Sequence, residues 1–212
     1  ELGRLANVAA TSERKPAPRG LTPPAPKAAV AATFAPGEVF RGYVIAGEFA
    51  QGGLSILYEA THPTSLKRCL VKVLKPHYRQ PHFKAMQDKL VAEGELLMSA
   101  SGRNPFLVPV HDCGRDDEVG PFVIMDKLEG RTLHSHMQQQ RAMAATFEPA
   151  SVARLGIAIA EALHTMHELG AVHRDVKPLN LFIPDARGGS LQVVLLDWGC
   201  AKSVHSPHTS YE

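Results

Sequence analysis

The chain has 212 residues, of which 44% are hydrophobic, so it can bury a sizeable core and still carry a tail. Its 23 basic and 21 acidic residues leave a formal net charge of +2, which gives no electrostatic argument for binding nucleic acid or an anionic membrane surface. The three cysteines (Cys69, Cys113 and Cys200) form no CxxC pair, which argues against a disulfide framework or a zinc knuckle and favours the reducing cytoplasm.

Signals for membrane insertion or secretion do not occur in this sequence. No run approaches the roughly 18 apolar residues of a membrane span, and the N-terminus lacks the apolar core of a signal peptide. Because the sequence begins at Glu1 rather than Met, we expect that upstream residues have been lost. A membrane anchor in that upstream part would be compatible with all of these observations.

The N-terminal region is rich in proline and alanine. Six prolines lie between Lys15 and Pro36, with almost no large apolar side chains among them. Such a composition cannot bury enough surface to offset the entropy lost on ordering. We therefore predict that residues 1–37 are a disordered linker.

Two regions of different periodicity follow the linker. Residues 38–128 contain β-rich runs and one helical stretch over Lys84 to Ala100; the runs are YVIAGEF (43–49), SILYEAT (55–61), RCLVKVL (68–74), FLVPVHD (106–112) and PFVIMDK (121–127). After Thr132 the pattern becomes helical, and before Gly170 apolar residues recur at helical spacing: Val152, Leu155, Ile159, Ala162, Leu163 and Met166. The sequence predicts an α+β fold, an antiparallel sheet with one helix followed by a mainly helical part.

The stretch AVHRDVKPLNLFI, residues 171–183, groups charged and amide side chains between apolar flanks. Asp175 and Asn180 lie on either side of Pro178, which prevents a regular helix and favours a loop that directs both side chains into one cleft. There a carboxylate can accept a hydroxyl proton and Lys177 can neutralise a phosphoryl group in transfer. The amide oxygen of Asn180 is a hard ligand that suits Mg²⁺.

A second acidic position ends the apolar run in VVLLDWG, residues 193–199. Asp197 follows a predicted strand and precedes Trp198 and the flexible Gly199, a place that suits another metal ligand. A single Asp is far more commonly a solvated loop residue, so the functional interpretation rests on both motifs together.

HRDVKPLN resembles the catalytic loop HRDxxxxN of protein kinases, and DWG resembles their metal-binding DFG with Trp in place of Phe. The resemblance runs from about Phe40 to Glu212 and is strongest to bacterial serine/threonine protein kinases. It implies a bilobal fold, with the N-lobe and hinge at 38–128 and a partial C-lobe at 129–212 that ends within the activation segment. It also implies a transferase that uses ATP and Mg²⁺ to phosphorylate protein serine or threonine.

The resemblance assigns roles to individual residues. Asp175 would be the catalytic base and Lys177 would neutralise charge; its position after Asp175 favours serine/threonine over tyrosine. Asn180 and Asp197 would hold Mg²⁺.

Upstream, the resemblance implies a lysine and glutamate pair that positions the nucleotide. Lys72 in CLVKVLK corresponds to the strand lysine of VAIK, and Glu93 corresponds to the helix glutamate that pairs with it. Together these two side chains would hold the α- and β-phosphates. Taken alone, Lys72 is as readily a solvent-facing strand lysine and Glu93 an exposed helix acid.

The glycine-rich loop departs from the family pattern. Aligning AQGGLSIL with GxGxxGxV places Ala50, Gly52 and Ser55 at the three glycines and Leu57 at the valine. Glycine permits backbone conformations that cost other residues about 1–2 kcal/mol, so we expect a stiffer loop or a weaker grip on phosphate. The GGLS stretch nevertheless resembles the GGxS version of this loop in bacterial kinases.

The adenine pocket also departs from the family pattern. VIMDKLEG resembles the hinge, with Met125 as gatekeeper and the backbones of Asp126 and Leu128 placed to bind adenine. Leu70 occupies the alanine position of VAIK and Phe182 the pocket floor. Since these side chains and Leu57 equal or exceed the usual occupants in size, we expect a crowded pocket.

Two other interpretations compete with an active kinase. The degraded loop and crowded pocket would suit a pseudokinase, a nucleotide-binding or empty scaffold that acts through protein contacts. The histidine pairs His134 with His136 and His164 with His167 suggest a metal site, but no cysteine or carboxylate completes either pair, and His167 matches a buried structural histidine of the family. We expect a cytoplasmic protein whose partners are ATP and a protein substrate, with no nucleic acid and no membrane segment in this piece.

Only 15 residues follow Asp197, and they resemble the start of an activation segment. Ser203, Ser206, Thr209 and Ser210 would be phosphosites for Arg174 to engage. The later helices of the family do not follow, so we expect Leu155, Ile159 and Leu163 to face water on at least one side.

If Leu155, Ile159 and Leu163 face water, residues 1–212 alone should be unstable, and this can be tested. Burial of each such residue contributes about 1.5–3 kcal/mol, against a total stability of about 5–15 kcal/mol. We expect this piece to bind a hydrophobic dye, to melt without a sharp transition and to phosphorylate no peptide, whereas a chain extended to its natural C-terminus melts cooperatively. A cooperative, dye-silent melt of the short piece would contradict the argument.

Overall fold

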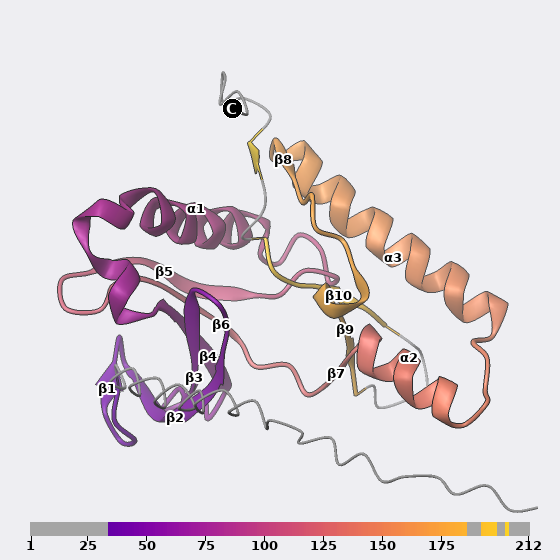
Figure 1. Ribbon diagram of the computed structural model, residues 1–212, viewed down its shortest axis with the longest axis horizontal. Coiled ribbons are helices and arrows are strands. Elements are labelled where there is room, and N and C mark those ends of the chain that lie inside the picture. Colours follow the sequence, from indigo (N-terminus) through magenta and orange to yellow (C-terminus); the bar gives the residue numbers. More distant parts are fainter. Residues whose placement is uncertain (1–33, 186–191, 199–201, 204–212) are drawn as a thin grey trace, which may run out of the picture.

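The computed structural model describes residues 34–185, 192–198 and 202–203. They form two lobes, with the sheet and the helix α1 (Lys84–Ala100) in one and the long helix α3 (Pro149–Glu168) in the other (Figure 1). The chain crosses between the lobes after β6 (Gly120–Asp126). The bilobal α+β fold expected from the sequence is confirmed.

The N-lobe is an antiparallel sheet of six strands in the order β1-β2-β3-β4-β6-β5. Its other strands are β1 (Val39–Phe40), β2 (Tyr43–Gln51), β3 (Ser55–Thr61), β4 (Arg68–Leu74) and β5 (Val110–Asp116), and two 3₁₀ turns, η1 (Pro76–Arg79) and η2 (Pro81–Phe83), lead from β4 into α1. Four strands and the helix lie close to where the sequence predicts them. The predicted run 106–112 is wrong by four residues at its start, because Leu107 instead bridges to Leu195 of the other lobe.

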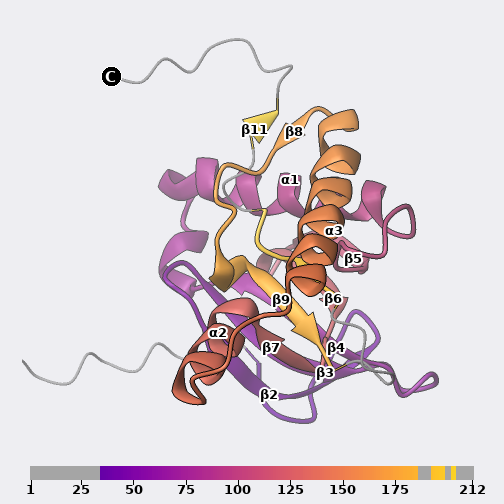
Figure 2. The same ribbon diagram turned by 90° about the vertical axis from the view of Figure 1, so that its right-hand side faces the viewer.

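The C-lobe combines two helices with short strands. Its elements are β7 (Gly130–Thr132), α2 (Leu133–Ala142), α3, β8 (Ala171–Val172), η3 (Pro178–Asn180), β9 (Leu181–Pro184), β10 (Val194–Leu195) and β11 (Lys202–Ser203). One small sheet has the order β10-β9-β7, and β11 pairs with β8. Figure 2 shows β9 lying between α2 and α3, with the segment that precedes β9 descending along α3. This arrangement places the residues of the predicted catalytic loop at the boundary of the two lobes.

One face of the N-lobe sheet has its own core, which alternate residues of β3 and β4 fill. Phe34 belongs to this core: it is 3% exposed and its ring lies 5.1 Å from that of Tyr58 and 4.9 Å from that of Phe40. Phe34 therefore packs in the N-lobe core, although it lies within the segment predicted to be a linker. The rest of the predicted linker, residues 1–33, lies outside the described part of the chain.

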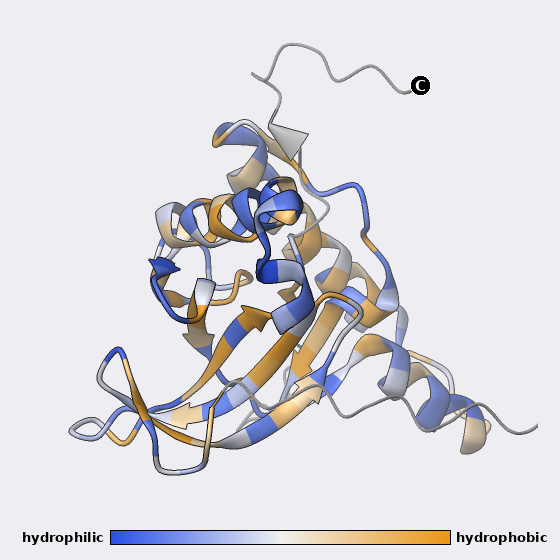
Figure 3. Ribbon diagram, turned by 60° about the vertical axis from the view of Figure 1, so that its left-hand side comes forward, coloured by the Kyte–Doolittle hydropathy of each residue, from blue (hydrophilic) through white to orange (hydrophobic). Residues whose placement is uncertain are grey.

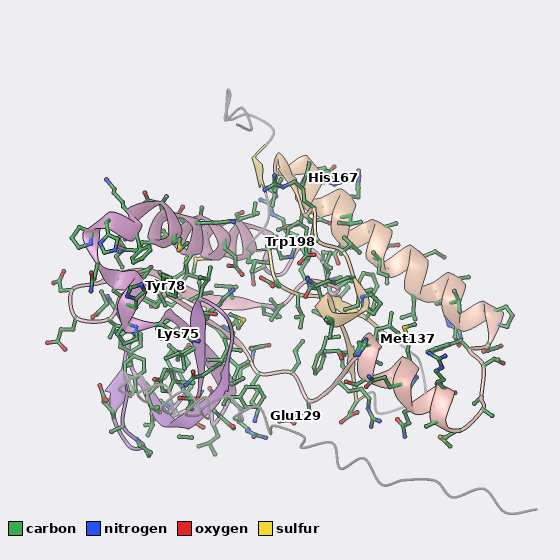
Figure 4. The ribbon with its side chains drawn as sticks, viewed as in Figure 1. Lys75, Tyr78, Glu129, Met137, His167 and Trp198 are labelled. Atoms are coloured by element: carbon green, nitrogen blue, oxygen red, sulfur yellow. The ribbon has the colours of Figure 1, made fainter. Side chains whose placement is uncertain are left out.

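A second core joins the lobes. It includes Leu97 of α1, Met166 of α3 and Leu195 of β10, all at most 2% exposed, together with Trp198. Figure 4 shows Trp198 between α1 and α3. The asparagine Asn104, in the connection after α1, adds hydrogen bonds to Glu161 O at 3.0 Å and to Thr165 Oγ1 at 2.8 Å. The two lobes are thus packed together and not merely linked by the chain crossing.

The exposed face of α3 differs from the expected one. Leu155 is buried, and Ile159 and Leu163 are partly buried and pack against the core between the lobes. Val152 and Ile157 face water instead, at 52% and 60% exposure. The helix therefore exposes other apolar residues than expected, because Leu155, Ile159 and Leu163 point toward the core between the lobes.

Hydrophobic residues concentrate along the strands, whereas α1 and α2 carry many hydrophilic positions (Figure 3). Among the helices in the described ranges, none has the length and apolar content needed to cross a membrane. His167, expected to be buried, is exposed near the end of α3.

The indole of Trp198 is the basis of a stability prediction. The residue is 1% exposed, and its Nε1–H has no hydrogen-bond partner among the residues that the structure describes. A buried, unsatisfied donor costs about 1–3 kcal/mol.

Trp198→Phe removes that donor at the cost of some packing, so we expect the free energy of unfolding to change by less than about 1 kcal/mol. The control Leu195→Ala deletes apolar atoms only and should cost about 2–5 kcal/mol. Urea unfolding of the natural-length protein measures both, and equal losses in the two variants would argue that the indole N–H is satisfied in solution.

Candidate active site

Lys72 and Glu93 meet between the N-lobe sheet and α1. Lys72 Nζ lies 2.7 Å from Glu93 Oε1 and 3.0 Å from Oε2, and Glu93 is only 7% exposed. Burial disfavours the ammonium, but the carboxylates of Glu93 and, 3.9 Å away, Asp197 outweigh it and raise the pKa of Lys72. The ammonium form of Lys72 is therefore favoured here, and the structure brings together the two residues that the sequence paired at a distance.

Gly94 allows α1 to approach the sheet closely enough for this contact. A Cβ at Gly94 would lie 2.6 Å from Cys113 Cβ and 2.8 Å from Val123 Cγ2, closer than real Cβ contacts. Because Glu93 is the preceding residue, the fit of Gly94 against β5 and β6 sets the distance from which Glu93 reaches Lys72. Gly94 was not predicted as a site residue, although a glycine beside the paired glutamate in VAEGELLM is a visible signal of close helix packing.

The loop from His173 to Asn180 brings Asp175, Lys177 and Asn180 together. Lys177 Nζ lies 2.6 Å from Asp175 Oδ2, and Asn180 Nδ2 donates to Asp175 O at 2.9 Å and to Oδ2 at 3.0 Å. The hydrogen bond from Lys177, assisted by the one from Asn180, lowers the pKa of Asp175. The carboxylate is thus ionised at neutral pH and is about one-third exposed, so it can meet an incoming hydroxyl.

Asp197 and Asn180 are adjacent through the backbone. The N–H of Leu196 donates to Asn180 O at 2.8 Å, which places the start of DWG beside the catalytic loop. Asp197 has a left-handed backbone (φ 57°) and a side chain that is 56% exposed. Both hydrogen bonds from Asn180 Nδ2 go to Asp175, and no described residue donates a hydrogen bond to the Asn180 amide oxygen, which can therefore accept a ligand. A carboxylate and an amide oxygen fit Mg²⁺.

The imidazole of His173 connects the loop that holds Asp175 to the segment that precedes Asp197. Its Nδ1 accepts from the Asp175 N–H at 3.2 Å, so Nε2 carries the proton and donates to Leu196 O at 3.0 Å. Its ring lies 4.4 Å from the Trp198 ring, edge to face. The imidazole is 1% exposed, so its role here is to hold the two segments together.

The glycine-rich loop folds as a hairpin without needing its missing glycines. Ala50 pairs with Leu57 in the sheet, and Gly52 N donates to Ser55 O at 2.9 Å. A Cβ on Gly52 would come no closer than 3.5 Å to Ser55 Oγ. Ala50 and Ser55 therefore do not strain the loop in this conformation.

Of the predicted adenine residues, Leu57, Leu70 and Met125 lie on the face of the sheet that also carries Lys72. Leu70 is the register partner of Met125, and Leu57 that of Lys72. Met125, Leu128 and Phe182 pack against the core between the lobes.

The hinge is held by ion pairs that the sequence analysis did not predict. Lys127 Nζ lies 2.7 Å from Glu59 Oε2, and Arg68 contacts both Glu59 and Glu129. Figure 4 shows Glu129 on the strand connection between the lobes. The ion pairs join residues as many as 68 positions apart, so no local motif announces them.

Ser203 lies in β11, while Ser206, Thr209 and Ser210 lie outside the described residues. Among the described residues, neither histidine pair belongs to a cluster of three potential metal ligands.

The comparisons with known proteins agree with this geometry. The sequence profile of the protein kinase domain matches residues 43–212. The chain is 28% identical over 172 residues to a probable serine/threonine-protein kinase PknB of Corynebacterium glutamicum, covering 77% of this chain and 24% of that protein. It is 29% identical over 175 residues to the serine/threonine-protein kinase PknF of Mycobacterium tuberculosis, covering 82% and 35%. The chain thus spans about a quarter to a third of these relatives.

The fold has solved counterparts. The PknI kinase domain of Mycobacterium tuberculosis superposes with a TM-score of 0.63 at 25% identity, over 78% of this chain and 61% of that one. The structure titled PpkA-294 apo form gives 0.64 at 24% identity, over 78% and 61%. Together with the profile match over most of the chain, this likeness shows that the protein belongs to the protein kinase domain family.

Proposed function

We propose that this protein transfers the γ-phosphoryl group of ATP to serine or threonine of a protein substrate in the cytoplasm. The contact of Lys72 with Glu93, next to Asp197 and the ionised Asp175, carries the proposal. Names of the relatives support the serine/threonine class.

Each residue has a task that its surroundings support. Asp175 accepts the proton of the substrate hydroxyl, and Lys177, 2.6 Å away, supplies positive charge where the phosphoryl group passes. Lys72 binds the α- and β-phosphates while Glu93 holds its ammonium in place. Asn180 and Asp197 would hold Mg²⁺, which neutralises phosphate charge when bound.

Adenine would bind beside the hinge. The Leu128 N–H makes no backbone hydrogen bond to the described residues, so it is available as a donor, and the Asp126 carbonyl would accept. Leu57 and Leu70 would cover one side of the base, with Phe182 below.

The alternative function, that of a pseudokinase scaffold, is based on the altered glycine-rich loop and on the large side chains of the adenine pocket. Ala50 and Ser55 fit the hairpin without strain, which weakens one part of that case. A direct measurement of ATP–Mg²⁺ binding and autophosphorylation in the natural-length protein separates the two functions.

The first test distinguishes the role of Asp175 as the catalytic base from that of Lys72 as a phosphate-binding residue. Asp175→Asn should lower kcat by about 10²–10⁴-fold and leave ATP affinity unchanged, since general base catalysis contributes that much. Lys72→Met should impair ATP positioning and also lower the melting temperature, because it leaves the buried Glu93 unpaired at a cost of about 3–5 kcal/mol. Steady-state kinetics, ATP titration and a thermal melt measure these effects. Wild-type turnover by Asp175→Asn would show that the base is assigned wrongly.

A second test leaves every reacting group intact. Gly94→Ala inserts a methyl group where Cys113 and Val123 already lie, so α1 must shift outward and Glu93 with it. We expect a stability loss of about 1–3 kcal/mol and a fall in kcat/KM. The control is Gly156→Ala in α3, away from the proposed site, where a Cβ meets nothing within 4 Å. Unchanged kinetics in folded Gly94→Ala would refute the link between helix approach and activity.

A further inference from the structure

A separate cluster of potential metal ligands lies behind the hinge. Cys69, His111 and Asp126 each offer one ligand atom, and these atoms all lie within 4.8 Å of one another. Among the residues that the structure describes, no other trio of His, Cys, Asp or Glu side chains meets this condition. Cys69 and Lys72 are three positions apart in β4, so the cluster is on the opposite face of the sheet from the proposed phosphate site.

The three ligands come from three neighbouring strands. Cys69 in β4 is the register partner of Asp126 in β6, so their side chains leave the same face of the sheet. His111 lies at an irregularity of β5, where the register shifts between Val110 and Asp112. A bulge of this kind adds a residue and redirects a side chain, and His111 Nε2 here contacts Asp126 Oδ1.

The burial and chemistry of the cluster suit zinc. Cys69 is 1% exposed, whereas the side chains of His111 and Asp126 are 26% and 17% exposed, so one side is enclosed and the other is reachable from water. Thiolate, imidazole and carboxylate are the three ligand types that zinc accepts, and water completes a tetrahedral site. Mg²⁺ and Ca²⁺ prefer oxygen ligands alone.

We propose that Cys69, His111 and Asp126 bind a zinc ion. Zinc bonds to Cys69 Sγ, a ring nitrogen of His111 and a carboxylate oxygen of Asp126, and the thiol proton leaves to solvent. Side-chain rotations that move the ligand atoms by about 1 Å bring them to the separations of a tetrahedral zinc site.

The ammonium group of Lys67 would compete with zinc for the Asp126 carboxylate. Its Nζ lies 2.8 Å from Asp126 Oδ1, so it neutralises the carboxylate when no metal is bound. The lysine side chain is 49% exposed, and it follows the turn residue Leu66, which has φ 56°. The ammonium can therefore move into water when zinc arrives, at the cost of one surface ion pair.

The location connects the cluster to the hinge. Asp126 ends β6, and the next residue, Lys127, begins the crossing to the C-lobe. If the proposed ATP site is correct, the Asp126 carbonyl also contacts adenine, so a bound zinc would fix one edge of that site. This extension rests on the proposed function, whereas zinc binding itself does not.

The test is a cobalt titration of the natural-length protein, without an affinity tag, followed by competition with zinc. We expect one equivalent of Co²⁺ to produce a near-ultraviolet thiolate charge-transfer band with the visible bands of tetrahedral cobalt, and zinc to abolish both. Cys69→Ser should lose the charge-transfer band, whereas the matched variants Cys113→Ser and Cys200→Ser should keep it. Because no nucleotide is used, failure here leaves the phosphotransfer proposal untouched.

Three further variants keep the result decisive if Cys69→Ser does not fold. His111→Gln and Asp126→Asn should each weaken zinc at least about tenfold, since metal-site mutations commonly cost that much. Lys67→Met should strengthen zinc by up to about fivefold, because it removes a competing charge worth up to about 1 kcal/mol. No charge-transfer band in wild type, or a band that survives in Cys69→Ser, would overturn the proposal. Binding by Lys67→Met alone would also overturn it and make Lys67 the resident cation.

Discussion

The pair formed by Lys72 and Glu93 is the interaction on which the site depends, because it spans the space between sheet and helix. Bringing both charges out of water is costly, and two apolar side chains of the same size would commonly give equal or greater stability. The pair is therefore better explained by the position it gives an ammonium than by stability. Asp197, 3.9 Å from the same ammonium, extends the charge arrangement into the other lobe.

The predicted catalytic loop and the DWG turn are joined in a different way, by hydrogen bonds around the buried imidazole of His173. His173 binds the backbone on either side, at Asp175 N and Leu196 O, and Leu196 N in turn binds Asn180 O. These bonds join the main chains of the two segments through the imidazole and through the backbone itself. The loop can thus hold chemically reactive groups at partial exposure while its main chain stays fixed.

Local patterns in the sequence predicted most of the site and the type of most elements. HRDVKPLN and DWG are each short enough that spacing alone decides which side chains come together, and β3, β4 and α1 carry strong periodicity. The predictions were wrong where contacts between residues far apart in the sequence determine the local structure. Phe34 sits in a Pro/Ala-rich segment yet fills the N-lobe core, and Leu107 leaves its predicted strand to bridge Leu195. The α3 positions expected to face water were misplaced because the core between the lobes covers Leu155 and contacts Ile159 and Leu163. His111 joins Cys69 and Asp126 only through an irregular register, which no spacing rule reveals.

The sequence contains one tryptophan, and it stands in the motif where the lobes meet. Trp198 is shielded from water, and the His173 ring lies 4.4 Å from it. All indole fluorescence of the chain therefore originates at this turn, beside a group able to quench it. Emission colour and intensity would follow the inward or outward position of DWG directly, so the substitution of Phe by Trp provides the protein with an optical reporter that needs no label.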